Sequence, residues 1–237
     1  KGAWMLVSAK GIFGTIGGGQ LEYMAIDEAR QLLRGARRRG HEGRTLHLDV
    51  PLGPEIGQCC GGRVDVAVSL VDGAKRNALV EMMTAEERLQ PRILIFGGGH
   101  VGHALAAALV LLPVRPVIVE TRAEALEGMP TGVETKLTAM PEEMVREAPA
   151  GSAFVILTHD HALDFLIAAE ALKRDDAAYV GMIGSKTKKA TFRSWYLKTA
   201  GGSEASFARL VSPIGGDAVR DKRPAVIAAL ASAEIMT

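Results

Sequence analysis

The stretch Arg92-Ile-Leu-Ile-Phe-Gly-Gly-Gly-His-Val-Gly102 decides the fold class of this chain. Its first five residues form a short apolar run, typical of a strand that is buried on both faces of a parallel sheet. Glycines at positions 97, 99 and 102 then match the G-x-G-x-x-G pattern that joins a strand to a helix in dinucleotide-binding domains. An apolar, helix-like stretch over residues 104–112 follows. Together these features predict the first strand-turn-helix unit of a doubly wound α/β domain.

Strand-like and helix-like segments continue to alternate after this unit. This alternation indicates βαβ units and a parallel sheet that is covered by helices on both faces. The expected strands cover residues 114–120, 133–138, 153–158 and 178–183, and the expected helices cover residues 121–127, 141–147, 160–174, 186–199 and 223–235.

The first ninety residues are less regular. Apolar and polar residues alternate over 44–50 and 63–70, which indicates strands with one solvated face. We also expect a strand over 3–7 and helices over 20–34 and 79–89. With the linker placed at Gln90-Pro91, residues 1–90 form a smaller N-terminal α+β domain and residues 91–237 form a Rossmann-like domain.

Composition excludes several classes of protein. Hydrophobic residues make up 48% and charged residues 23% of the 237 residues, as in globular proteins. A net charge of +1 offers no basic excess for nucleic acid or an anionic membrane. The longest apolar run, over residues 104–114, is too short to span a bilayer. The two cysteines are adjacent and cannot form a disulfide framework, which predicts the reducing cytoplasm.

The glycine-rich turn predicts a nucleotide or a nucleotide-like ligand. Its glycines permit a tight turn, a close approach of the backbone to a pyrophosphate, and close packing of the helix on the strand. Phosphates would lie at the N-terminus of the helix. Glu120 ends the next expected strand and is placed to bind a ribose hydroxyl, while Arg122 would instead accept a 2′-phosphate. The alternative is a turn that is kept for packing alone. The candidate residues are Gly97, Gly98, Gly99, His100, Gly102, Glu120 and Arg122.

Four of the six histidines follow two strands that we expect to be neighbours. His100 and His103 follow the first strand of the domain, and His159 and His161 flank Asp160 after the fourth. In doubly wound sheets these two strands lie side by side, and a ligand crevice opens at their carboxyl ends. Three interpretations stay open: a divalent metal site, a general base, or Asp160 as a helix cap with histidines lining the crevice. We favour the third.

Two further turns precede expected helices. Gly184-Ser-Lys186 follows the fifth strand, and its hydroxyl and cation suit a phosphate. The alternative is an ordinary turn in which Ser185 caps the helix. The N-terminal run Gly14-Thr-Ile-Gly-Gly-Gly19 predicts a second anion cradle.

The segment Gly57-Gln-Cys-Cys-Gly-Gly62 carries both cysteines. Adjacent cysteines lack the Cys-x-x-Cys geometry of zinc sites, but flanking glycines would leave the thiols accessible to a bulky ligand. Thiolates suit soft metal centres. The alternative is a buried structural pair. We take Gln58, Cys59, Cys60, Gly61 and Gly62 as candidate cofactor-binding residues, with the two cysteines as candidate metal ligands.

These motifs, in this order, resemble the XdhC/CoxI family of xanthine dehydrogenase accessory proteins. The resemblance rests on Gly14-Thr-Ile-Gly-Gly-Gly-Gln-Leu-Glu22, Gly57-Gln-Cys-Cys-Gly-Gly62, Ile95-Phe-Gly-Gly-Gly-His-Val-Gly102, Thr158-His-Asp-His161 and Gly181-Met-Ile-Gly-Ser-Lys186. It departs from the family in two places. A Gly-Ser-x-Pro-Arg-like segment has no counterpart before Lys1, and residues 212–224 lack the usual continuation of their Pro-Ile-Gly motif.

The resemblance implies a chaperone for the molybdenum cofactor (molybdopterin) rather than a turnover enzyme. Such proteins bind the cofactor and shield it while a cysteine desulfurase exchanges an oxo for a sulfido ligand. They then help deliver it to a xanthine dehydrogenase-type molybdenum hydroxylase. The resemblance also implies a small N-terminal domain, a Rossmann-like C-terminal domain and often a homodimer.

Two rival functions stay open at this point. One is an NAD(P)-dependent oxidoreductase that uses the turn at residues 97–102 to bind its dinucleotide and a crevice histidine as base. The other is a metal-binding regulatory module. A ligand that co-purifies with the protein would distinguish them: a fluorescent oxidised pterin, a nicotinamide, or metal alone.

Overall fold

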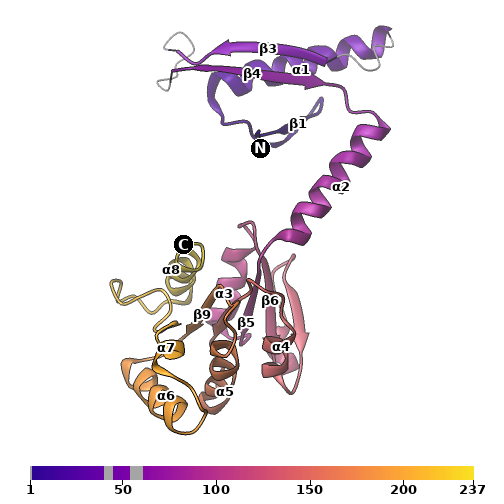
Figure 1. Cartoon of the computed structure of the whole chain (residues 1–237). Helices are drawn as coiled ribbons and strands as arrows, with labels where there is room; N and C mark the ends of the chain where they lie inside the picture. The colour runs from indigo at the N-terminus through magenta and orange to yellow at the C-terminus, as the bar shows by residue number, and fades with distance from the viewer. Residues whose placement is uncertain (1, 40–44, 54–60) are drawn as a thin grey trace. The chain divides into compact units, whose positions relative to one another are not determined.

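The computed structural model describes residues 2–39, 45–53 and 61–237, and Figure 1 labels its helices and strands. The chain divides into two compact units, Lys1–Met83 and Thr84–Thr237. The division falls inside helix α2 (Gly73–Leu89), whereas the sequence placed it just after that helix. No helix among the described ranges combines the length and the apolar character needed to cross a membrane.

The described residues of the N-terminal unit form two antiparallel strand pairs, one long helix and the first part of α2. The exposure of side chains in its second pair alternates, so these strands have the one solvated face that their sequence predicts. Strand β2 was not expected from sequence, because it has only two apolar residues between glycines. The elements are β1 (Met5–Val7), β2 (Ile12–Gly14), α1 (Gly19–Arg39), β3 (Thr45–Pro51) and β4 (Arg63–Ser69).

The C-terminal unit is built on one six-stranded parallel sheet. Its order is β10-β9-β8-β5-β6-β7, which is the doubly wound Rossmann order. The prediction of a Rossmann-like sheet is confirmed. The strands are β5 (Arg92–Phe96), β6 (Arg115–Glu120), β7 (Glu134–Leu137), β8 (Ala153–Ile156), β9 (Tyr179–Met182) and the two-residue β10 (Leu210–Val211).

Helices cover both faces of this sheet (Figure 1). The helix expected over 121–127 is a single 3₁₀ turn, η2, because Arg122 is still extended at its start. The helix expected over 104–112 begins earlier, directly at the end of the glycine-rich turn. The helices are α3 (His100–Leu109), η2 (Ala123–Leu126), α4 (Pro141–Glu147), α5 (His161–Leu172), α6 (Lys186–Lys198), α7 (Glu204–Phe207) and α8 (Pro224–Ile235).

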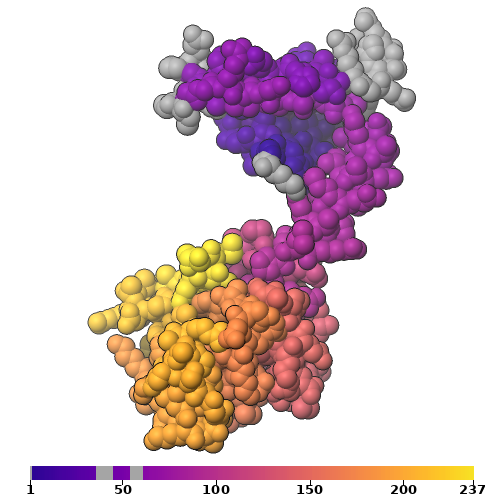
Figure 2. Space-filling view, viewed as in Figure 1, coloured from indigo at the N-terminus to yellow at the C-terminus, as the bar shows by residue number. Residues whose placement is uncertain are grey.

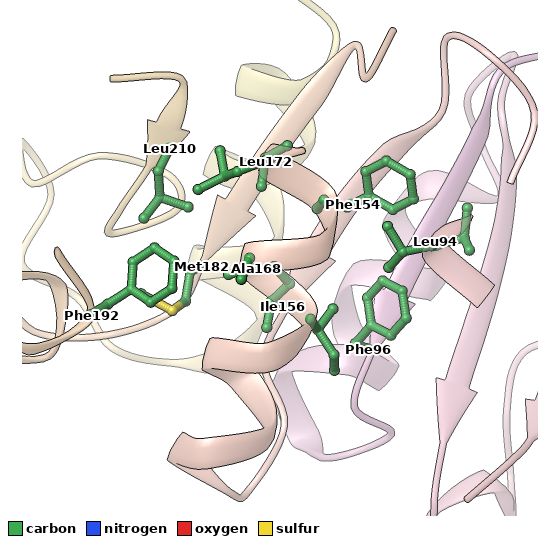
Figure 3. Close-up of a cluster of buried hydrophobic side chains, with 14 of the residues drawn as sticks. Leu94, Phe96, Phe154, Ile156, Ala168, Leu172, Met182, Phe192 and Leu210 are labelled. Carbon is green, nitrogen blue, oxygen red and sulfur yellow. The ribbon is translucent and has the colours of Figure 1, made fainter. Parts of the chain in front are cut away.

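The parallel sheet separates two hydrophobic clusters, and strand β5 contributes side chains to both of them. Leu94 and Phe96 point into the cluster that includes residues of α4, α5 and α6 (Figure 3). Ile93 and Ile95 point to the opposite face, where α3 and α8 pack. Because side chains of a strand alternate between faces, this apolar run is buried on both sides, as predicted. Of the helices on the first face, α6, drawn in orange, lies at the surface of this unit (Figure 2).

Candidate functional site

Three turns meet at the carboxyl edge of the parallel sheet. Strand β8 pairs with β5 on one side and with β9 on the other. Phe96 is in register with Ile156, and Ile156 with Met182, so the chain leaves all three strands at the same level. The structure therefore brings together three groups of predicted site residues: Gly97, Gly98, Gly99, His100 and Gly102; His159, Asp160 and His161; and Gly184, Ser185 and Lys186.

Two glycines of the first turn are required for packing. Gly97 has a φ of +122°, and a Cβ added there would lie 2.4 Å from the carbonyl oxygen of Leu157. A Cβ on Gly102 would lie 2.1 Å from the carbonyl oxygen of Gly97. These contacts are the tight turn and the close helix packing that the glycine pattern predicts.

Gly99 stands apart because its side of the turn is open. A Cβ added at Gly99 would meet nothing within 4 Å. Gly99 is also the N-cap of α3, and it supplies no side-chain hydrogen bond to the start of that helix. The first amides of an α-helix have no partner within the helix and attract anions. The open side of Gly99 is thus the point where an anion can approach the backbone.

Gly98 faces the protein instead. Its N–H donates to Glu120 Oε2 at 2.9 Å. A Cβ at this position would lie 2.3 Å from the carbonyl oxygen of Ala125 in η2. The middle glycine therefore holds the turn against the end of β6 and the 3₁₀ turn that follows it.

The carboxylate of Glu120 is buried and fully engaged. Besides Gly98, its partners are the Thr121 N–H at 2.8 Å and the Arg122 guanidinium, whose Nη2 lies 3.3 Å from Oε2. Burial raises the pKa of Glu120, but these hydrogen bonds outweigh burial and lower the pKa to about 2. The Thr121 hydroxyl and the Arg122 N–H also lie within hydrogen-bond distance of Oε1. A carboxylate has about four acceptor positions, so a ribose hydroxyl must displace an existing bond. A 2′-phosphate would be bound by the Arg122 guanidinium, which already donates to Glu120. The ligand roles of Glu120 and Arg122 stay predictions.

The second turn confirms the capping interpretation of Asp160. Its Oδ1 accepts the N–H of Ala162 at 2.7 Å and that of Leu163 at 3.4 Å, at the start of α5. These two bonds lower its pKa, with smaller contributions from His159 and His161. Both histidines are exposed. The described residues contain no group of three His, Cys, Asp or Glu side chains suited to a metal ion, and the general-base interpretation stays a prediction.

A buried ion pair below this turn was missed by sequence reasoning. Asp164 of α5 is fully buried, and its Oδ2 contacts Nζ of Lys188 on α6, whose side chain is 7% exposed. Its Oδ1 accepts the Thr158 N–H at 3.0 Å and lies 2.7 Å from the Thr158 hydroxyl. The available signal was a lone acid among the apolar residues 162–169, which looks like an ordinary first-turn acid.

The third turn is an ordinary helix start. Ser185 caps α6, since its Oγ accepts the Lys188 N–H at 3.2 Å. This confirms the capping role that the alternative interpretation gives to Ser185. The Lys186 side chain is 89% exposed, and its Nζ lies 3.7 Å from Oδ2 of Asp217. At Gly184, the space of a side chain is taken by the stem of Lys188. A phosphate-binding role for these residues stays a prediction.

The prediction of an anion cradle at residues 14–19 of the N-terminal unit is wrong. Oε2 of Glu22 occupies it by accepting the hydroxyl of Thr15 at 2.5 Å and the amides of Ile16 and Gly18 at 3.0 and 3.1 Å. The bond from Thr15 is the largest cause that lowers the pKa of Glu22. The turn thus carries its own anion, supplied by the helix that it opens.

The cysteine motif falls partly outside the described residues. Gln58, Cys59 and Cys60 lie outside them, so their roles in cofactor and metal binding stay predictions. Gly61 and Gly62 precede β4 with φ of +59° and +104°. The carbonyl of Gly62 accepts the N–H of Leu52 at 2.9 Å, which ties the two ends of this connection together.

The N-terminal unit also contains an open, mainly apolar cavity of about 550 Å³. Strands β1 and β4 and helix α1 line it, with Met5, Leu21 and Val66 among its walls. The sequence did not predict this cavity, because its walls come from segments that are far apart in the chain.

Comparisons with known proteins agree with this fold. The model of the XdhC Rossmann domain matches residues 93–235, and the model of the XdhC and CoxI family matches residues 1–48. The uncharacterized protein YqeB of Escherichia coli (strain K12) is 28% identical over 244 residues. That match covers 99% of this chain, which spans only 40% of the length of YqeB.

A solved structure has a similar fold. It is the crystal structure of a protein described as a xanthine dehydrogenase from Bacillus halodurans, with a TM-score of 0.73. The match covers 98% of this chain and 84% of that one, at 17% sequence identity. At this identity the likeness concerns the fold alone.

Proposed function

Because this chain belongs to the XdhC and CoxI family, we propose that it is an accessory protein in the maturation of a xanthine dehydrogenase-type molybdenum hydroxylase. It binds the molybdenum cofactor as cargo and shields it while a cysteine desulfurase exchanges an oxo for a sulfido ligand. It then passes the cofactor to the client enzyme. In this proposal the protein acts in the cytoplasm, as a homodimer, by binding rather than by turnover.

The open start of α3 is the observation that carries this proposal. Molybdopterin ends in a phosphate, which needs N–H donors and a positive potential. The side of Gly99 is open, and the first amides of α3 have no side-chain cap from it. A helix N-terminus supplies both the donors and the potential. The donor set at this edge therefore fits the phosphate of the cofactor.

Exposed side chains near the N-terminus of α3 could form hydrogen bonds with the polar pterin of the cofactor. His100, His159 and His161 are exposed at the same edge of the sheet, and an imidazole can donate or accept a hydrogen bond. At the molybdenum end, the thiolates of Cys59 and Cys60 would supply soft ligands. That last part of the proposal rests on the motif alone.

Dinucleotide binding is the main competing function. It is favoured by the G-x-G-x-x-G turn between β5 and α3, in the strand order of dinucleotide-binding domains. However, Glu120 and Arg122, which would have to recognise the ribose end, are hydrogen-bonded to each other. We therefore favour a ligand that needs only the phosphate-binding part of the turn.

Ligand analysis tests the proposal directly. The chain is purified under reducing, anaerobic conditions, and the released small molecules are identified by mass spectrometry and by pterin fluorescence after oxidation. We expect a pterin phosphate and molybdenum. A nicotinamide dinucleotide, or a metal ion without pterin, would contradict the proposal. In a second assay, the purified chain should increase the activation of a cofactor-free xanthine dehydrogenase-type enzyme.

A further inference from the structure

Stability alone does not account for the buried pair Asp164–Lys188. Asp164 is fully buried and the Lys188 side chain is 7% exposed. Removing two charges from water costs free energy that their mutual attraction often only balances, so apolar replacements of similar size are frequently neutral or stabilising. Such a pair points to a requirement for geometry rather than for stability.

On one side, the pair holds the turn that carries the exposed histidines. Asp164 Oδ1 accepts the Thr158 N–H at 3.0 Å and lies 2.7 Å from the Thr158 hydroxyl. That hydroxyl in turn accepts the Asp160 N–H at 3.2 Å. Two hydrogen bonds therefore place the backbone at both sides of His159.

On the other side, the pair holds the turn after β9. The stem of Lys188 fills the space beside Gly184, where a Cβ would lie 2.6 Å from Cδ of the lysine. The N–H of Lys188 donates to the capping hydroxyl of Ser185. The lysine whose ammonium group contacts Asp164 therefore also packs against this turn, through both its stem and its backbone.

The glycine-rich turn is connected to the same group of contacts. A Cβ on Gly97 would lie 3.1 Å from Cα of Thr158, so the two turns touch through their backbones. Contacts thus run from the turn after β5, through Thr158, Asp164 and Lys188, to the turn after β9.

We propose that Asp164 and Lys188 are positioning residues that set the relative placement of the three turns for cofactor binding. The pair touches no ligand itself; it fixes the backbone from which the turns present their amides and imidazoles. The part concerning the cofactor rests on the proposed function, whereas the part concerning the turns can be tested without a ligand.

The principal test replaces both partners together, with Asp164→Leu and Lys188→Met, so that no buried charge is left alone. A control replaces a more solvent-accessible pair at the C-terminal end of α5, Glu170→Gln with Lys173→Met. Lys173 Nζ and Glu170 Oε1 are 2.6 Å apart, and the lysine and glutamate side chains are 56% and 21% exposed. Two quantities are measured: amide hydrogen exchange over residues 157–161 and 183–186, and binding of isolated molybdenum cofactor, followed by the fluorescence of its oxidised pterin.

We expect the apolar pair to melt close to the wild-type temperature, while the amides of Thr158 and Asp160 exchange faster and cofactor binding falls by roughly tenfold or more. The control should match the wild type in both measurements. Unchanged exchange and binding in the apolar pair would overturn the proposal. If the wild type binds no cofactor, the proposed function fails, but the exchange measurement still decides whether the pair holds the turns.

A second pair of variants covers the case in which the apolar pair does not fold. Thr158→Val removes the hydroxyl that lies 2.7 Å from Asp164 Oδ1 but keeps both charged residues in place, and Thr158→Ser keeps the hydroxyl. We expect the valine variant to bind cofactor more weakly and the serine variant to bind like the wild type. Equal binding in these two variants would show that the hydroxyl does not position the turn, and would count against the proposal.

Discussion

The two glycine-rich turns of this chain, at residues 14–19 and 97–99, each give an amide to a glutamate, but the glutamates come from different places. Glu22 lies in the helix that its own turn opens, and it accepts two amides and a hydroxyl of that turn. Glu120 ends the neighbouring strand and accepts only the amide of Gly98 from its turn. The first turn is therefore satisfied by its own helix, while the second keeps an open side at Gly99. Glycine spacing alone does not distinguish these two cases.

The largest expected effect on stability comes from comparing Gly97, which lies in close backbone contact, with Gly18, which has only a left-handed φ. Gly97→Ala should destabilise the protein by about 3 kcal/mol or more, because a backbone contact and a left-handed φ oppose the new Cβ. Gly18→Ala, in the other turn, meets no neighbour within 4 Å and has only its φ of +76° against it, so about 1 kcal/mol is expected. Chemical denaturation of the two variants measures the difference, and equal losses would contradict this distinction.

A second prediction compares how Glu120 and Glu22 affect the stability of the protein as the pH is lowered. The pKa of Glu120 is lowered from 4.5 to about 2, so its ionised form stabilises the fold above pH 4.5, and this stabilisation is lost as the pH falls toward 2. Glu120→Gln should remove about 2–3 kcal/mol at pH 7 and flatten the acid limb of the stability curve.

Glu22→Gln is the matched control for this measurement. The pKa of Glu22 is also lowered, but Glu22 is only half-buried, so solvent screens its interactions more than those of the buried Glu120. We expect a smaller change at pH 7 and an acid limb close to that of the wild type. Denaturation curves at a series of pH values compare the two variants. An identical pH dependence in both would show that the burial of Glu120 has no energetic consequence.

A third prediction concerns Asp160, an exposed acid that caps the start of α5, whereas the half-buried Glu22 binds the turn before its helix. Asp160→Ala removes the acceptor for two amides of α5, so the melting temperature should fall by a few degrees. Asp160→Ser, which keeps a capping oxygen, should recover most of this loss. If both variants bind the cofactor normally, the aspartate serves the helix alone. If the alanine variant binds weakly after its stability is matched, Asp160 also contacts the ligand.

Much of the fold could be predicted from the sequence because its signals are local. The apolar run of β5, the glycine at position 102 and the helix caps Asp160 and Ser185 depend on residues within a few positions of one another. The missed elements β2, β10 and α7 are three, two and four residues long, and segments of that length have no detectable periodicity.

The partners of buried charges could not be predicted in the same way. Glu120 and Gly98 are 22 residues apart, and Asp164 and Lys188 are 24 residues apart. The sequence indicates that these residues are polar, but only the packed sheet determines which acid meets which donor. The wrong prediction of an anion cradle at residues 14–19 also came from an unpredicted partner, here one close in sequence. A glutamate in the first turn of a helix, such as Glu22, can either face solvent or fold back onto the turn before the helix.

Substitution of Gly99 is expected to change stability least and to be the most informative about function. Its φ of −74° suits any residue, and its Cβ would meet nothing within 4 Å, so Gly99→Val should fold. Its melting temperature should fall only slightly, because valine is a poorer N-cap residue than glycine. The new side chain would instead occupy the space through which a phosphate reaches the amides of α3. Binding of isolated molybdenum cofactor should therefore weaken by roughly tenfold or more, since hydrogen bonds to a charged group are lost. Gly99→Ala is the graded control, with an intermediate loss. Wild-type affinity in a folded Gly99→Val variant would place the cofactor elsewhere and would leave this turn with a packing role alone.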